Sequence, residues 1–399
     1  MNGKNGVPVA HRIEPRVNRY YLKVSRLYMA AGITLMLILI LYAVSVMMFF
    51  GEYVTYDNLK YLVRDWSAMT MPGSESFTDI VYSTSEDAEF TLFRNGLALY
   101  DHEIYSYYDE SGICLVEDET GYGDPASAVS EKYLLLYDIG GTGYTVYNQL
   151  TRIISRDADR AIITGDIADD GSMVIVTRSR ETRFVAEVYN AAFAKTMNIY
   201  KENYVLDAGI SPDGKNVVIC SAVPSDTDFN LEVEIVRTGA SEKTALLNYE
   251  HTMPLDMVMT QDGFVLLCDN GIYFFDYDGH ITSSVNFGGM SLVYADMNGT
   301  TVAAAGRTNA LGSENRIIVC DIRGNVLYDS VLRERITGIT ASRNQEKALA
   351  YVMGANSVLK LMPDGEIEVH KPESGEILDV VSRKRDVLIC RTGGAYVWN

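Results

Sequence analysis

A repeated pairing of turn and apolar strand fills most of the chain and limits the folds open to it. One series places an Asp-Gly or Asn-Gly turn before an apolar run at intervals of 43, 49 and 36 residues, at Asp170-Gly171, Asp213-Gly214, Asp262-Gly263 and Asn298-Gly299. A second series, out of phase with the first, ends in glycine at Gly279, Gly324 and Gly365. A unit of roughly 40–45 residues with two turns at fixed phases is typical of a four-stranded β-propeller blade. The sequence therefore predicts an all-β propeller.

The number of blades follows from the positions of the units. Seven full units start near residues 77, 113, 161, 204, 254, 291 and 336, and a short one starts at 375. The last unit has room for three strands only, so a strand from Phe77–Thr84 is expected to complete it. Seven or eight blades fit, and eight is preferred. A pair of β-sandwiches is the alternative, but separate sandwiches would not keep one common repeat. We expect apolar inner strands and a polar outermost strand in each blade.

An uncharged segment precedes this domain. Leu27–Phe50 contains no charged residue in 24 positions. A helix of that length rises about 36 Å, enough to cross a hydrocarbon core of roughly 30 Å. The sequence predicts a basic cytoplasmic tail over 1–26, a signal-anchor helix over 27–50, a juxtamembrane helix and linker over 51–76, and an extracytoplasmic propeller over 77–399.

Charge sets the expected orientation in the membrane and excludes one class of partner. Six basic residues precede the helix, and Arg12, Arg16, Arg19, Lys23 and Arg26 are the predicted orienting residues. The tail is expected to contact the lipid bilayer. The rest of the chain carries a net charge of about −24, given totals of 34 basic and 53 acidic residues. A domain this acidic is not expected to bind nucleic acid.

The five cysteines are spread along the chain and follow no metal-binding spacing. At least four end an apolar run, at Cys220, Cys268, Cys320 and Cys390. They are interpreted as small buried hydrophobic residues and not as a disulfide framework.

One phrase carries a resemblance to known propellers. Ile210-Ser211-Pro212-Asp213-Gly214-Lys215 followed by NVVIC resembles the repeat phrase of TolB-like and WD40-like propellers. With the segment DNLKYLVRDW at 57–66, the whole chain resembles uncharacterised single-pass membrane proteins of Gram-positive bacteria with an outer propeller-like domain. No WD dipeptide ends the units, which departs from the WD40 pattern. The resemblance implies architecture and topology, and no activity follows from it.

No motif of known chemistry stands out. His102, His251, His280 and His370 are scattered, and no catalytic triad signature or phosphate loop occurs. Acidic clusters could serve a glycan-active enzyme or calcium, but solvated turns explain them as well. They are Glu117/Asp118/Glu119, Asp157/Asp159 and Asp166/Asp169/Asp170. No cofactor, metal or catalytic residue is predicted.

Tyrosines offer a possible binding surface, because they present flat amphipathic rings to partners or sugars. The first two units are rich in them, and the predicted surface residues are Tyr105, Tyr107, Tyr108, Tyr122 and Tyr144. Strand packing is the alternative explanation for the same residues. The sequence as a whole favours a membrane-anchored, non-enzymatic binding or scaffold protein of the cell envelope, whose partner is an envelope protein or a wall polymer. The alternatives are a glycan-active enzyme using acidic residues of the funnel, and an envelope sensor.

Overall fold

The computed structural model describes residues 19–50, 79–84, 87–226, 228–239, 243–308, 314–372 and 376–398. The chain divides into two compact units, Met1–Pro72 and Gly73–Asn399.

The described residues of the first unit form one long helix, α1 (Arg19–Phe50). It begins eight residues before the predicted segment, and its stretch Lys23–Tyr42 is long and apolar enough to cross a membrane. Arg19, Lys23 and Arg26 therefore lie in the first turns of the helix. Arg12, Arg16 and the predicted juxtamembrane helix lie outside the described residues, and the predicted orientation stays a prediction.

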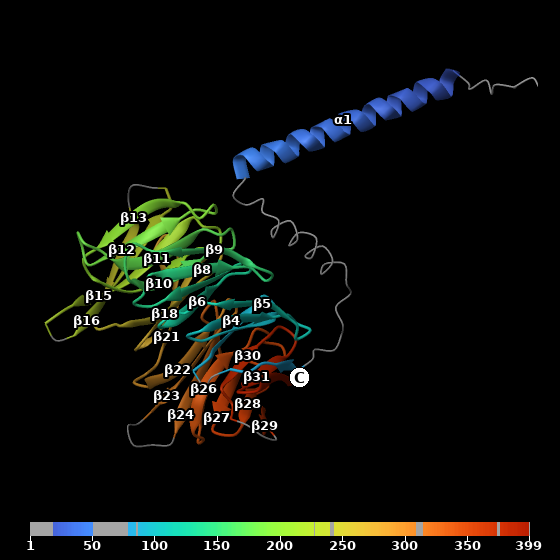
Figure 1. Ribbon diagram of the computed structural model, residues 1–399. Helices are drawn as coiled ribbons and strands as arrows, with labels where there is room; N and C mark the ends of the chain where they lie inside the picture. Colours follow the sequence, from blue (N-terminus) through green and yellow to red (C-terminus); the bar gives the residue numbers. More distant parts are fainter. Residues whose placement is uncertain are drawn as a thin grey trace, which may run out of the picture. The chain divides into compact units, whose positions relative to one another are not determined.

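The second unit is a propeller of eight four-stranded antiparallel sheets, numbered here as blades 1 to 8 (Figure 1). Blade 1 contains β2 (Glu89–Phe93), β3 (Gly96–Tyr100), β4 (Ile104–Tyr108) and β5 (Cys114–Glu119). Blade 2 contains β6 (Pro125–Val129), β7 (Leu134–Asp138), β8 (Gly143–Tyr147) and β9 (Arg152–Asp157). Blade 3 contains β10 (Ile162–Ile167), β11 (Met173–Arg178), β12 (Phe184–Tyr189) and β13 (Lys195–Lys201). Blade 4 contains β14 (Tyr204–Ile210), β15 (Asn216–Pro224), β16 (Phe229–Arg237) and β17 (Lys243–Tyr249).

The remaining blades follow the same order from the innermost strand outward. Blade 5 contains β18 (Pro254–Met259), β19 (Gly263–Cys268), β20 (Gly271–Asp276) and β21 (Ile281–Asn286). Blade 6 contains β22 (Ser291–Met297), β23 (Thr301–Arg307), β24 (Asn315–Asp321) and β25 (Val326–Leu332). Blade 7 contains β26 (Ile336–Ala341), β27 (Ala350–Gly354), β28 (Val358–Leu361) and β29 (Ile367–His370). Blade 8 contains β30 (Asp379–Ser382), β31 (Val387–Arg391), β32 (Gly394–Trp398) and, as its outermost strand, β1 (Ile80–Val81).

The N-terminal strand closes the ring, which confirms the preferred count of eight blades. Ile80 pairs with Ala395 and Val81 pairs with Gly394. The predicted starts of the first two units, near 77 and 113, are wrong. Blade 1 begins at Glu89 and blade 2 at Pro125, because the segment that starts the domain belongs to the last blade and shifts the count by about 12 residues.

Both turn series lie on one face of the ring. In an antiparallel blade, the turns from the first to the second strand and from the third to the fourth strand are at the same end. Asp213-Gly214 is a turn of the first kind and Asp278-Gly279 one of the second kind. Gly279, Gly324 and Gly365 have φ between 84° and 91°, which only glycine adopts without strain. We call this end the turn face, and the opposite end, which carries the links between blades, the connection face.

Burial follows the order of the strands. The second and third strands of most blades are almost wholly buried, for example β19 and β23, whereas outermost strands such as β17 alternate between exposed and half-buried. The outermost strands are the most exposed, as predicted, but some carry exposed apolar residues, such as Val326 and Val331 of β25, so the prediction that they are polar holds in part. Blades pack against each other through mixed apolar clusters, one of which joins residues of β11 and β12 to residues of β14 and β15. Of the five free cysteines, four are buried as predicted, and Cys114 is exposed.

Candidate functional site: the channel mouth and a pocket between two blades

The innermost strands of five consecutive blades share a β-bulge near their start, at the connection face. In β14, Val205 pairs with Ser221 and Asp207 pairs with Cys220, so that Leu206 is the extra residue. The same irregularity occurs in β10, β18, β22 and β26, with Ile163, Leu255, Val293 and Thr337 as extra residues. A bulge bends its strand and re-aims the side chains beside it, and it often accompanies a functional site.

Three of these bulges expose large apolar side chains. Leu206, Leu255 and Val293 are 39%, 51% and 43% exposed, and they belong to three neighbouring blades. Strands β14 and β18, which carry Leu206 and Leu255, lie side by side around the central axis, and β22, which carries Val293, is the innermost strand of the next blade. The three residues therefore form part of the rim of the channel at the connection face, and we call them the channel rim. Single exposed apolar residues need no explanation, but a repeated structural feature that exposes three of them does.

Acidic side chains follow two of the three rim residues at the next position along the strand, whereas Val293 is followed by Tyr294. Asp207 comes directly after Leu206, and Asp256 directly after Leu255. Asp379 and Glu89 lie at the corresponding start of β30 and β2. We call these four residues the upper acids. Besides burial, which is the largest cause, Asp256 raises the pKa of Asp207, and Asp296 and Glu89 raise that of Asp379.

Two further acids lie deeper and tie neighbouring blades together. Asp166 Oδ2 accepts the backbone N–H of Ile210 at 2.8 Å, and Asp296 Oδ2 accepts that of Ala341 at 2.8 Å. Each bond joins the innermost strands of adjacent blades. Burial raises the pKa of each of these carboxyls to about 6, although these bonds oppose the shift. We call them the lower acids, and their bonds give them a structural role.

Burial is the largest cause of the raised pKa values of three upper acids, Asp207, Asp256 and Asp379. It raises the pKa of Asp207 to about 7 and that of Asp379 to about 7, and neighbouring carboxylates add to both shifts. The Asp256 pKa is raised by burial as well. Each of these aspartates accepts the N–H of its own next residue, as Asp207 does from Ala208 at 2.8 Å. Near neutral pH the channel therefore exchanges protons.

Asp207→Asn is expected to stabilise the domain at high pH. The folded-state pKa of Asp207, about 7, lies above the ordinary value of 3.8, so the folded state holds the proton more tightly than the unfolded state. Asp207 therefore does not reduce the free energy of unfolding below about pH 4, and it reduces that free energy increasingly as the pH rises toward 7. Denaturant unfolding at pH 8 should show a gain of about 1–3 kcal/mol, after allowance for solvent in the channel, with little change at pH 4. Asp213→Asn is the control, because Lys215 and Ser211 lower the pKa of that exposed carboxyl, and its loss should not stabilise.

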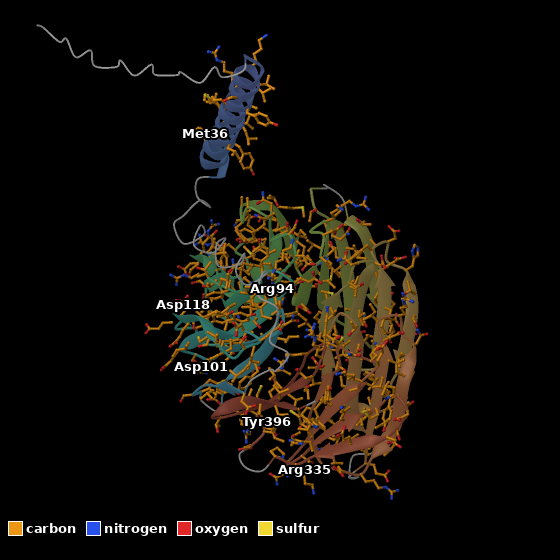
Figure 2. The ribbon with its side chains drawn as sticks, turned by 90° about the vertical axis from the view of Figure 1, so that its right-hand side faces the viewer. Met36, Arg94, Asp101, Asp118, Arg335 and Tyr396 are labelled. Carbon is orange, nitrogen blue, oxygen red and sulfur yellow. The ribbon has the colours of Figure 1, made fainter. Side chains whose placement is uncertain are left out.

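A second site is a pocket of about 240 Å³ between the outer parts of blades 1 and 2. It is lined by Asp118, Glu119, Thr120, Tyr122, Gly143, Thr145, Tyr147, Arg152, Ser155, Arg156 and Asp157. Figure 2 shows Asp118 at the periphery of the propeller. Asp118 Oδ2 accepts from Tyr147 Oη at 2.9 Å and from Arg152 Nη1 at 3.0 Å. The pocket thus brings together acids from two of the predicted clusters. The Asp118 carboxylate is already paired with the Arg152 guanidinium.

The predicted tyrosine surface is not formed. Tyr105, Tyr107 and Tyr144 are buried, and Tyr108 and Tyr122 are half-buried. Tyr105 stacks on Tyr147 with ring centroids 4.1 Å apart. The physical reason is that a third strand such as β4 or β8 is covered by neighbouring blades on both of its faces. Of the five residues, Tyr122 alone lines the pocket, where its hydroxyl bonds Thr145 Oγ1 at 2.8 Å.

The histidines and the other predicted acidic clusters remain scattered. His280 bonds Asp276 within one exposed turn, and His370 stacks on Trp398 between blades 7 and 8. Asp169 and Asp170 bond backbone N–H groups in turns, as expected of solvated turn residues. Within the described part of the chain, no group of three or more His, Cys, Asp or Glu residues could hold a metal ion.

Eight four-stranded blades, together with an apolar N-terminal helix, define an eight-bladed β-propeller whose described residues include one candidate membrane span. The chain belongs to DUF5711, described as a family of unknown function, which matches residues 73–393. No curated protein matches the chain.

Solved structures share the fold at low sequence identity. BamB from Moraxella catarrhalis aligns with a TM-score of 0.52 at 10% identity, over 81% of this chain and 100% of that one. The Pan2 WD40 domain of Neurospora crassa aligns with a TM-score of 0.43 at 11% identity, over 69% and 87% of the two chains. The similarity to BamB supports the propeller fold alone.

Proposed function

We propose that this protein is a membrane-anchored, non-enzymatic binding or scaffold protein of the cell envelope, and that its connection face binds a partner protein. The observation that carries this proposal is the channel rim. Three consecutive blades use the same bulge to expose Leu206, Leu255 and Val293. Exposing apolar side chains in this way costs solubility, and recognition of a partner explains it.

Rim substitutions should separate binding from folding. Leu206→Ser together with Leu255→Ser removes apolar contact area without disturbing a buried side chain. In-cell cross-linking of the full-length protein, followed by capture and mass spectrometry, should recover one envelope protein near stoichiometrically from wild type and at least about tenfold less from the double variant. Leu246→Ser is the matched control, because the exposed fraction of Leu246, 46%, lies between those of Leu206 and Leu255, but Leu246 is on the outermost strand of blade 4. Equal recovery from the double variant and the wild type would contradict the proposal.

The proposed location places the propeller outside the cytoplasm, with the basic tail inside. The excess of Lys and Arg before the apolar segment Leu27–Phe50 supports this orientation. A native cysteine can test it, because Cys114 is exposed and the other four are buried. A membrane-impermeant maleimide applied to intact cells should label the protein, and Cys114→Ser should abolish the label. Labelling should be slow below pH 8, since burial raises the pKa of the Cys114 thiol. Labelling only after lysis would place the propeller in the cytoplasm.

An enzyme acting on a glycan is the second candidate. The observation in its favour is that two aspartates on different innermost strands, Asp207 and Asp379, have pKa values of about 7, which suit a general acid. Release of reducing ends from purified wall glycan by the wild type, and not by Asp207→Asn, would favour this function over the first.

A further inference from the structure

We propose that the channel mouth receives a partner segment that places a lysine or arginine side chain among the upper acids while apolar residues beside it contact the channel rim. This inference rests on the proposed function and adds the chemistry of the partner. It combines two features of the same bulges, the exposed apolar residue and the acid that follows it.

The first argument is the coupling of the two residue types in one structural element. In β14 the bulge sets Leu206 and Asp207 opposite the single residue Cys220. In β18 the bulge sets Leu255 and Asp256 opposite Leu267. Neither feature occurs without the other in these two neighbouring blades. A ligand that covers the rim therefore meets carboxylates one residue deeper in the channel.

The second argument is that these exposed and half-buried carboxylates lack a cation, although the chain supplies one to acids that are buried elsewhere. Glu187 pairs with Lys195 at 2.7 Å, and Glu234 pairs with Lys201 at 2.6 Å. Among the described residues, no ion pair involves any of the four upper acids. An unpaired carboxylate in a partly desolvated channel gains from an incoming positive charge.

The groups around the channel narrow the choice of cation. Arg343 acts on Asp296, one of the lower acids, so the deeper level already has a positive group near it. The described acids do not converge in a group that could hold a metal ion. An organic cation on a long apolar stem fits better, because the methylene groups of lysine or arginine can pass the rim while the charge reaches the acids.

Peptide selection can test this chemistry while the partner itself is still unidentified. The probe is a displayed library of random 12-residue peptides, selected on the full-length protein in nanodiscs. Enriched sequences should carry a Lys or Arg within two residues of apolar side chains. A synthetic peptide of enriched sequence should bind the double variant Asp207→Asn and Asp256→Asn at least about tenfold more weakly than wild type. Replacing its basic residue by norleucine should weaken binding to wild type by a similar factor and have no effect on binding to the double variant.

Each of the other outcomes contradicts a specific part of this proposal. Peptides that bind wild type and the Asn variant equally, yet fail on Leu206→Ser with Leu255→Ser, would refute the role of the acids and leave the proposed function standing. Peptides whose binding is unchanged by both pairs of substitutions would refute the channel mouth as a docking site. A selection that enriches no peptide would refute it as well. Misfolding cannot imitate the expected result, because the Asn substitutions are expected to stabilise the domain and leave its thermal unfolding cooperative.

Discussion

Ile80→Asp is expected to unfold the propeller or lower its free energy of unfolding by about 3–5 kcal/mol. Ile80 is 1% exposed and belongs to an apolar cluster that includes Leu97 of blade 1 and Leu388 of blade 8. Its neighbour Val81 is 78% exposed, although both residues pair with β32. Val81→Asp is therefore the matched control, and it should change stability by less than about 0.5 kcal/mol.

Deleting residues 77–84 should destabilise the domain at least as strongly as Ile80→Asp, because it also removes buried Tyr82 from the same cluster. Thermal unfolding of the full-length protein in detergent, followed by circular dichroism, measures both changes. An unaltered melting temperature in the deletion variant would rule out closure by β1.

Lys201→Met should cost a comparable amount of stability. Lys201 is 4% exposed, and its Nζ contacts Glu232 Oε1 and Glu234 Oε2 at 2.6 Å each, joining blade 3 to blade 4. Removing the ammonium group leaves buried Glu234 with Lys243 alone, at 3.0 Å. A buried pair that loses one partner typically costs about 3–5 kcal/mol.

The exposed pair between Lys215 and Asp213, at 2.8 Å, provides the control for this prediction. Lys215→Met should change the free energy of unfolding by about 0–1 kcal/mol. If urea unfolding of Lys201→Met gave a change as small as that of Lys215→Met, the interblade pair would not stabilise the ring.

The repeat could be predicted because each blade carries its own local signals. Turns such as Asp213-Gly214 and Asp278-Gly279 mark fixed points in a blade whatever the blade contacts. The start positions of the first two units could not be predicted in the same way. The segment near Ile80 has strand chemistry, but the strand that it pairs with is near the other end of the domain.

The channel mouth was not predicted, although the sequence carries a signal for it. An apolar residue followed by Asp opens three units, at Leu206-Asp207, Leu255-Asp256 and Leu378-Asp379. The dipeptide coincides with a bulge in β14 and β18 but not in β30, so it marks the acids of the channel and does not by itself predict the bulges. The tyrosine prediction failed for the opposite reason. Tyr105 and Tyr107 do alternate as on a half-exposed strand, but blades cover both faces of β4.

Closure by β1 also sets the timing of folding during synthesis. Ile80 is among the first residues of the domain to be made, and its partner Ala395 is among the last. Until the final blade is complete, the segment around Ile80 stays unpaired, with its apolar side chain uncovered and its strand edge open. The blades that form from local contacts assemble during this time. A chain that is still being synthesised therefore contains finished blades but no ring. A stop anywhere before blade 8 leaves a product that cannot close, and such truncated chains should be selectively degraded.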